Sequence, residues 1–365
     1  MKPLGTSPAF LRLIFPAVLL MTGLGTSANT LAHSSDVLAV GDTGDDSVRF
    51  FDASTGKLLP DPLIAPGSGG LHGPRGILHD AQRKEWIVSN QNVDQPYPGE
   101  ILRYDAHGKP LGALVPRTDP YAPYAPRGIV LLKNDANNLL FVADMGDVGV
   151  PGKLLAYRVR GKQATFIANL DPNLKTPGKT GPFHPRGIVL GPDGYLYVSL
   201  FNLPEPCGGS VVRFDPKKLA FKDVLISNPA DCNANVNDLH RPEGLVFSPR
   251  GDLYITSGSV PVVSFCADKI LIIPKHAWRA GRFHLPLQRI DLYKEGEPPA
   301  FAQALLFGPR GHLFVPIANT GEVRRYNVET KAFWTFVPAG RGLGRPWYLS
   351  FARTNPATLA YRDDD

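Results

Sequence analysis

The sequence has few cysteines and no long apolar run, and both shortages limit what the protein can be. Only three cysteines occur among 365 residues, and their spacing does not resemble a zinc site. The apolar run near the N-terminus covers about ten residues, where a membrane-spanning helix needs about 20. We therefore expect no stable membrane span.

Several sequence signals of nucleotide and nucleic-acid chemistry are also missing. The net charge of +6 comes from residues scattered along the chain, without a basic arm or a polybasic patch. No Gly-x-Ser-x-Gly elbow, phosphate loop or dinucleotide fingerprint occurs in a suitable context. Nucleic-acid binding, nucleotide chemistry and a Ser-His-Asp hydrolase are therefore not expected.

The N-terminal segment has the pattern of an export signal. Two basic residues and no acidic one precede Asp36, and small residues after the apolar run offer cleavage after Ala28 or Ala32. We predict a signal peptide over residues 1–32 and a single mature domain over residues 33–365. The protein is then periplasmic or secreted, with a net charge of about +4 once two basic residues are removed.

What the sequence does contain is a repeated unit, rich in glycine (37) and proline (36). Its clearest copies are HPRGIVLGPDGYLYVSLFN (residues 184–202) and RPEGLVFSPRGDLYITS (residues 241–257). Each copy opens with Pro-x-Gly and continues as short apolar strands joined by tight turns. The openings lie at Pro74, Pro126, Pro185 and Pro242, with degenerate copies at Ala302-Gln303-Ala304 and Pro346-Trp347-Tyr348. Intervals of 44 to 60 residues suit a four-stranded propeller blade.

The two chain ends complete each other. Residues 38–59 carry the later strands of a unit without its first strand, and residues 346–353 carry a first strand alone. We predict an all-β fold, a six-bladed β-propeller of four-stranded blades whose ring closes by pairing these segments. A strand-like tail at residues 358–361 competes for the same slot, and the sequence leaves that pairing open.

Three segments resemble known propeller families. GDTGDDSVRFFDASTG resembles the NHL repeat, HPRGIVLGPDGYLYVS resembles the repeats of virginiamycin B lyases, and RPEGLVFSPRGDLYIT resembles gluconolactonase- and regucalcin-like propellers. The resemblance implies the propeller fold and, for two of these families, metal-dependent chemistry. In gluconolactonase-like enzymes the position of Glu243 commonly carries an asparagine metal ligand, and the histidine and glutamate of the lyases have no clear counterparts here.

Loop lengths point to one face of the predicted ring. The turns between first and second strands and between third and fourth strands are tight, whereas the other connections are long. In an up-and-down blade the long connections emerge on the same face, and long loops usually carry binding residues. We expect the site there, around the mouth of the central channel.

Arginines recur at the start of the predicted inner strands. Three occupy the middle of Pro-x-Gly and two directly precede the proline: Arg75, Arg127 and Arg186, then Arg241 and Arg345. Guanidinium groups form bidentate hydrogen bonds with carboxylates or phosphates, and several that converge predict an anion-binding mouth. The alternative is that each arginine turns sideways and binds carbonyl groups of a neighbouring blade.

A metal site is a second candidate at this mouth. Its candidate ligands are Glu243, His72, His184, His240, Asn90 and Asn202. Glu243 is also the candidate catalytic base, and the cofactor is then a divalent cation such as calcium, magnesium or zinc. The alternative is that the histidines and asparagines bind turn backbone, the role we prefer for Asp42 and Asp144.

The cysteines also fall in long loops. A disulfide between Cys232 and either Cys207 or Cys266 would join loops on the site face, and the sequence does not decide between them.

Two functions stay open from the sequence. The first is an exported propeller that binds a small anionic molecule, a glycan or a protein partner at the channel mouth. The second is a metal-dependent hydrolase or lyase acting there on a lactone-like or cyclic ester substrate, so that catalysis itself is undecided. A monomer is expected in either case.

Overall fold

The structure is a computed structural model, and it describes residues 36–92, 95–134, 138–147, 150–170, 183–202, 206–258, 267–293 and 296–363. Contacts divide the chain into two units, Met1–Ser34 and Ser35–Asp365, and all the described residues belong to the second unit. The predicted signal peptide lies outside the described residues. Within the described ranges, no helix has the length and apolar character needed to cross a membrane.

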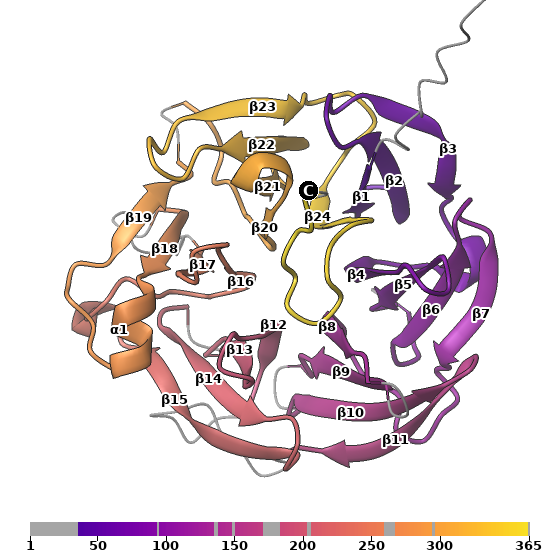
Figure 1. The fold of residues 1–365 in the computed structure, drawn as a ribbon, viewed down its shortest axis with the longest axis horizontal. Coiled ribbons are helices and arrows are strands. Elements are labelled where there is room, and N and C mark those ends of the chain that lie inside the picture. Colours follow the sequence, from indigo (N-terminus) through magenta and orange to yellow (C-terminus); the bar gives the residue numbers. More distant parts are fainter. Residues whose placement is uncertain are drawn as a thin grey trace, which may run out of the picture. The chain divides into compact units, whose positions relative to one another are not determined.

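Six four-stranded antiparallel sheets are arranged around a central axis (Figure 1). Blade 1 consists of β24 (Pro346–Phe351), β1 (Val37–Asp42), β2 (Ser47–Asp52) and β3 (Leu58–Ile64). Blade 2 consists of β4 (Pro74–Asp80), β5 (Glu85–Asn90), β6 (Glu100–Asp105) and β7 (Pro110–Val115). Blade 3 consists of β8 (Pro126–Leu132), β9 (Asn138–Asp144), β10 (Lys153–Arg160) and β11 (Gln163–Asn169).

The remaining blades follow in chain order. Blade 4 consists of β12 (Pro185–Leu190), β13 (Leu196–Leu200), β14 (Gly209–Asp215) and β15 (Ala220–Asn228). Blade 5 consists of β16 (Leu245–Phe247), β17 (Leu253–Ser257), β18 (Lys269–Ile273) and β19 (Gln288–Asp291). Blade 6 consists of β20 (Leu306–Phe307), β21 (Leu313–Ile317), β22 (Glu322–Tyr326) and β23 (Phe333–Val337). The predicted fold, a six-bladed propeller, is confirmed.

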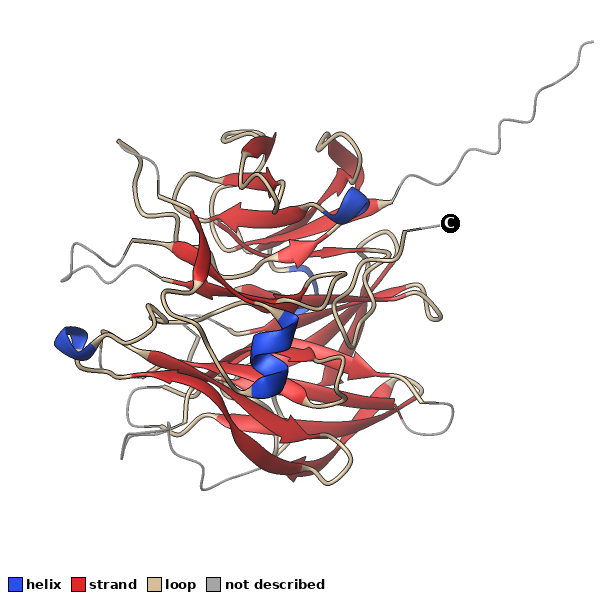
Figure 2. Cartoon of the chain, turned by 60° about the vertical axis from the view of Figure 1, so that its left-hand side comes forward, coloured by secondary structure: helices blue, strands red, loops and turns tan. Residues whose placement is uncertain are grey.

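Helix is scarce in the described part of the chain, as Figure 2 shows. The helical segments are α1 (Lys275–Ala280), which lies in blade 5, and the short turns η1 (Ser68–Gly70), η2 (Cys232–Ala234) and η3 (Pro309–Gly311). The core lies between neighbouring blades, where aromatic side chains meet across the blade boundaries. Phe50 of blade 1 contacts Trp86 of blade 2 edge-on at 5.1 Å between ring centroids. Such contacts explain why blades that expose apolar faces when alone are stable in a ring.

The ring closes in blade 1, where the first strand comes from the C-terminal end of the chain. β24 pairs antiparallel with β1, from Leu38 opposite Phe351 to Asp42 opposite Pro346. The predicted closure between the chain ends is therefore confirmed. The tail does not take that slot, because its only ladder contact among the described residues is the bridge between Thr354 and Tyr361.

The tail instead forms a loop across the axis, which we call the C-terminal loop (residues 354–361). It is the yellow trace in the middle of the ring in Figure 1. The carbonyl of Pro356 accepts a hydrogen bond from Leu131 N–H (2.8 Å), and that of Ala357 accepts one from Leu190 N–H (3.0 Å). Leu359 packs against apolar clusters that together draw on all six blades. The C-terminal loop therefore fills one end of the channel.

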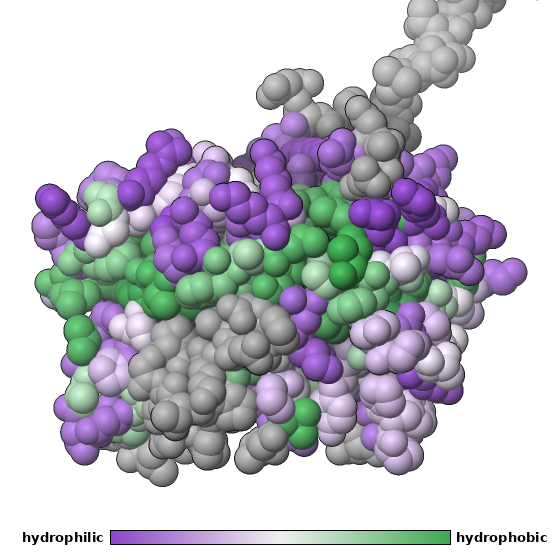
Figure 3. Space-filling model, turned by 90° about the horizontal axis from the view of Figure 1, so that it is seen from below, coloured by the Kyte–Doolittle hydropathy of each residue, from purple (hydrophilic) through white to green (hydrophobic). Residues whose placement is uncertain are grey.

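The outer edge of the ring has its own pattern of polarity. In the side view of Figure 3, apolar residues form a band between two more polar faces. Several large apolar side chains are exposed, among them Val224 and Trp334 on outer strands. Polar residues therefore concentrate on the two faces of the ring, and one of these faces contains the channel mouth.

Candidate functional site

The Pro-x-Gly motif forms a repeated irregularity at the start of the inner strand. In blade 2, Pro74 pairs with Asn90 and the next pair is Ile77 with Val88, so Arg75 and Gly76 together face one residue, Ser89. The same register shift occurs in blades 3 and 4. A bulge of this kind redirects a side chain, and here it acts on the arginine of each motif.

The glycine of the motif is needed because neighbouring inner strands lie very close together. A Cβ atom on Gly76 would lie 2.6 Å from the carbonyl oxygen of Arg127, and one on Gly187 would lie 2.3 Å from that of Glu243. Any larger side chain would push the strands apart. The motif therefore sets the width of the channel as well as the direction of the arginine.

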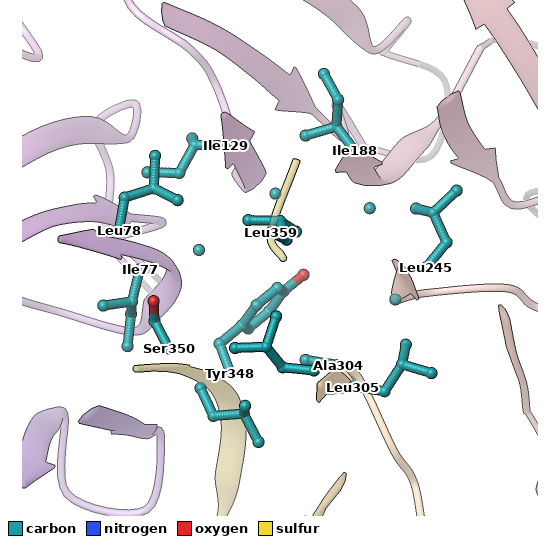
Figure 4. A pocket seen from close by; sticks show the side chains of 16 residues that line it. Ile77, Leu78, Ile129, Ile188, Leu245, Ala304, Leu305, Tyr348, Ser350 and Leu359 are labelled. Carbon is teal, nitrogen blue, oxygen red and sulfur yellow. The ribbon is translucent and has the colours of Figure 1, made fainter. Parts of the chain in front are cut away.

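Blade 1 departs from this rule and fills the channel. Where the other blades have a small residue, blade 1 has Tyr348; the small residues are Gly76, Gly128, Gly187, Gly244 and Ala304. Figure 4 shows the Tyr348 ring directed into the channel toward Leu359 of the C-terminal loop. These side chains line an apolar cavity of about 50 Å³. Five small residues thus make room for one tyrosine.

Above this cavity lies a layer that we call the inner ring, made by the middle residue of each motif. Its members are Arg75, Arg127, Arg186, Glu243, Gln303 and Trp347. Each is buried, with exposed fractions between 3% and 9%. Three consecutive blades therefore contribute cations, and the other three contribute a carboxylate, an amide and an indole.

Two arginines of the inner ring have partners. Arg186 lies 3.5 Å from Glu243, measured from Nη1 to Oε1, and stacks over Phe201. Arg75 donates from Nε to Gln91 (2.6 Å) and lies 4.0 Å above the Trp347 ring. Burial lowers the pKa of Arg186 to about 9 despite the nearby Glu243, and it lowers the pKa of Arg75 well below its usual value.

Arg127 differs from both, because its guanidinium is almost unpaired. It donates from Nη2 to the sulfur of Met145 (3.4 Å), a weak acceptor. Its Nε and Nη1 atoms are buried and have no hydrogen-bond partner in the described structure. The side chain is only 6% exposed, so water does not substitute freely for the missing acceptors.

The other two predicted arginines lie nearer the solvent at the same mouth. Arg241 lies 5.4 Å from the Phe201 ring, the ring that also supports Arg186. Arg345 is exposed and lies 5.4 Å from the Trp347 ring, which also contacts Arg75 and Arg127. The structure therefore brings the five arginines together in two tiers on shared aromatic side chains.

Serines make the carbonyl contacts that were the alternative role for the arginines. Ser89 donates to the carbonyl of Arg127 (2.9 Å), and Ser199 donates to the carbonyl of Glu243 (2.5 Å). Each serine lies opposite the bulge of one blade and binds the next blade. The arginine side chains are therefore not required for this link between blades.

Acceptor groups without partners complete the inner ring. Glu243 Oε2 and Gln303 Oε1 are buried and accept no hydrogen bond within the described residues. Both line a pocket of about 20 Å³ together with Phe201. The hydroxyl of Tyr348 is also unpartnered, and burial, followed by the charge of Glu243, raises its pKa to about 12. Tyr348 is therefore a neutral phenol between the arginines and the glutamate.

The candidate metal ligands have separate surroundings. His184 donates from Nδ1 to the carbonyl of Met145 (2.8 Å), which leaves its Nε2 as an unpartnered acceptor. His240 accepts at Nδ1 from Gly208 N–H (3.0 Å), so its neutral ring carries the proton on Nε2. Burial lowers the pKa of both histidines. His72 is partly exposed and pairs with Asp46 at 3.2 Å.

The residues that end the second strands hold the loop entering their own blade. The amide oxygen of Asn90 accepts from His72 N–H (2.7 Å), and its nitrogen donates to Gly70 O (2.9 Å) and to Asn92 (2.8 Å). Asp144 accepts from two backbone N–H groups of the loop before β8. Asp42 accepts from two backbone N–H groups at its blade entrance and from one in the turn that follows β1. The turn-binding role preferred for the two aspartates is confirmed.

The metal site itself stays a prediction. Asn202 donates weakly to Cys207 O (3.4 Å), and its own oxygen is unpartnered. In the described ranges no three His, Cys, Asp or Glu side chains form a group suited to a metal ion.

A disulfide joins two loops of the mouth. Cys207 and Cys232 are bonded, with Cα atoms 5.3 Å apart. Cys266 lies outside the described residues. The bond fixes the loop that leads to His240 and Arg241, and the backbone N–H of Arg241 then donates to Gly208 O (2.9 Å). The sequence left two partners open for Cys232, and in the structure its partner is Cys207.

Four site residues were not singled out from the sequence. Gln303 and Trp347 occupy the middle position of degenerate motifs, so the repeat itself marked them. Tyr348 occupies the glycine position of its motif, and a bulky residue there was a usable signal. Phe201 had no such signal, because its contact with Arg186 depends on how blade 4 folds back on itself.

Comparison with known proteins supports the fold alone. No protein-family model matches the chain, and no curated protein matches it either. A nidogen/laminin complex contains a chain with a TM-score of 0.58 and 16% identity, over 87% of this chain and 98% of that one. A protein of unknown function from Bacteroides caccae has a TM-score of 0.56 and 13% identity, over 87% and 99%.

A gluconolactonase is among the similar structures. The periplasmic gluconolactonase PpgL of Pseudomonas aeruginosa has a TM-score of 0.53 and 16% identity, over 87% of this chain and 98% of that one. A regucalcin structure and a virginiamycin B lyase structure also match, with TM-scores of 0.48 and 0.47. The resemblance to the gluconolactonase is confirmed as a likeness of fold: the chain is a six-bladed β-propeller with an arginine-rich, largely buried layer at the mouth of its channel.

Proposed function

We propose that this propeller binds a small anionic ligand at the mouth of its central channel. The observation that carries the proposal is Arg127, a guanidinium only 6% exposed whose Nε and Nη1 atoms have no acceptor in the described structure. A buried charge without partners is costly, and a ligand carboxylate or similar anion supplies the acceptors. Arg241 and Arg345, nearer the solvent, would attract the anion to the mouth.

The test is anion binding by the wild type and by Arg127→Met. Isothermal titration calorimetry with small carboxylates, sulfate and phosphate is expected to show binding to the wild type, reduced at least 100-fold in the variant. Arg158→Met is the matched control, because Arg158 is an exposed arginine of the same blade. Equal affinities of all three proteins, or no binding of any anion, would contradict the proposal.

Export is part of the same proposal. The N-terminal pattern supports it, and so does the Cys207–Cys232 disulfide, since such bonds persist mainly in oxidising compartments. Mass spectrometry of protein from the periplasm or the medium is expected to find a chain beginning at residue 29 or 33. A full-length chain retained in the cytoplasm would contradict export.

A metal-dependent hydrolase or lyase stays the alternative function. The observation in its favour is the unpartnered Oε2 of Glu243, a buried carboxylate oxygen able to act as a base. The adjacent Arg186 and two further arginines make a cation at this point electrostatically unfavourable. Elemental analysis that finds about one divalent ion per chain in the wild type, and none in Glu243→Ala, would favour the enzyme.

A glycan or a protein partner is the other occupant that we propose for the mouth.

A further inference from the structure

The charges of the inner ring do not balance. Three guanidinium groups face one carboxylate, Glu243, and all four side chains are at most 6% exposed. Glu243 is within ion-pair distance of Arg186 alone. In the described structure, Arg75 and Arg127 have no carboxylate that close. The layer therefore has an excess of two positive charges out of contact with water.

The free donor groups belong to two different arginines. The open edge of Arg127, Nε and Nη1, belongs to a guanidinium 5.1 Å from the Trp347 ring. The free Nε of Arg186 belongs to a guanidinium 3.9 Å from the Phe201 ring. The two guanidinium groups lie against different aromatic rings, so the layer offers two donor edges. Each edge can bind one carboxylate, which favours a ligand with two carboxylate groups.

The free acceptor groups require a donor from the ligand. Glu243 Oε2 and Gln303 Oε1 are both buried and unpartnered, and both line the pocket of about 20 Å³. A space of that size holds one oxygen-sized group. A hydroxyl group fits it and donates to either oxygen, whereas a ligand with carboxylates alone leaves both acceptors unsatisfied.

We infer that the ligand is a small hydroxy-dicarboxylate, with its two carboxylates on Arg127 and Arg186 and its hydroxyl in the pocket beside Glu243 and Gln303. This inference rests on the proposed function, because it names the class of anion. Two carboxylates neutralise the excess charge, and the hydroxyl satisfies the remaining acceptors. Burial lowers the pKa values of Arg75 and Arg186, and the nearby charge of Arg127 lowers both further.

The test compares four probes by calorimetry with the wild type. Malate has two carboxylates and a hydroxyl, succinate lacks the hydroxyl, lactate lacks one carboxylate, and inorganic phosphate has a single centre. Malate is expected to bind at least 10-fold more tightly than each of the other three. If succinate equals malate, or if lactate or phosphate binds more tightly, the inference is wrong while anion binding stands. If none of the anions binds, the proposed function itself fails.

A variant checks where the hydroxyl lies. Gln303→Met removes the amide oxygen but keeps the size and the apolar contacts of the side chain. We expect the preference for malate over succinate to shrink, with succinate affinity unchanged, because the hydroxyl then keeps Glu243 Oε2 as an acceptor in this pocket. Gln163→Met, at an exposed position in blade 3, is the control and is expected to keep the full preference. An undiminished preference in Gln303→Met would overturn the placement of the hydroxyl.

Discussion

Arg127 and Trp347 come from blades 3 and 1, yet they meet in the channel with the guanidinium carbon 5.1 Å from the indole centroid. Arg75 of the intervening blade lies against the same indole at 4.0 Å. One aromatic ring therefore supports two guanidinium groups of like charge. Burial lowers the pKa of Arg75, and repulsion by the charge of Arg127 lowers it further.

We expect Arg127→Met to stabilise the unliganded protein, by about 1 kcal/mol, because a buried and nearly unpaired charge is replaced by an apolar side chain of similar length. Urea unfolding in a buffer free of carboxylates, sulfate and phosphate measures the effect. Arg158→Met, at the exposed position in blade 3, is expected to be neutral. A loss of stability in Arg127→Met would show that the cation's contact with Trp347 outweighs its burial.

Gly187→Ala is expected to destabilise the ring by about 3 kcal/mol, because the new methyl group overpacks the boundary between blades 4 and 5. Its Cβ atom would lie 2.3 Å from the carbonyl of Glu243. Thermal unfolding of the variant tests this. Gly344→Ala serves as the comparison, since its Cβ atom would meet nothing closer than 3.6 Å. Similar melting temperatures for the two variants would contradict the close approach of the inner strands.

Removal of the disulfide is expected to cost about 3 kcal/mol, because it closes a loop with a sequence separation of 25 residues. Paired Cys207→Ala and Cys232→Ala substitutions should also weaken anion binding, since the released loop carries Arg241 to the mouth. Unfolding and calorimetry on the double variant measure both effects. Unchanged affinity would mean that the hydrogen bond between Arg241 and Gly208 suffices to place the loop.

The stability of the fold should fall as the pH drops below about 6.5, which is the ordinary pKa of a histidine side chain. Burial lowers the pKa of His184 and His240 in the folded state, so below that pH the unfolded chain binds more protons than the folded one. The difference in unfolding free energy between pH 7.5 and 5.0 should shrink in His240→Gln. His107→Gln, at an exposed position, should keep the wild-type difference. An identical pH response in both variants would contradict the role of His240.

The sequence predicted the ring because its repeats are made of turn chemistry and packing, which act locally. Pro-x-Gly at regular intervals indicated the blades, and the incomplete units at the two ends indicated the closure. The site was predicted less fully, because its contacts join blades that are far apart in the sequence. The contact between Arg127 and Trp347 follows only when the ring is closed. The place of Tyr348 likewise depends on five small residues in other blades.

The hydrogen-bonding roles of the polar residues could not be predicted from the sequence either. Asn90 and Asp144 occupy comparable positions, and either was compatible with a metal or with the turn backbone. The choice depends on whether particular N–H groups of the blade entrance point at them, as they do. Similarly, His184 and His240 differ in which nitrogen carries the proton, and that is set by a carbonyl in one case and an N–H group in the other.

The pairing of β1 with β24 gives the molecule a definite order of assembly. The strand that closes the ring, β24, follows all the other blade strands in the chain, so β1 to β3 lack their inner partner until β24 has been synthesised. Blade 1 therefore forms only after residue 351 is available. A chain cut short before residue 346 would leave blade 1 with three strands and the edge of β1 unpaired, and such an edge invites pairing with other chains.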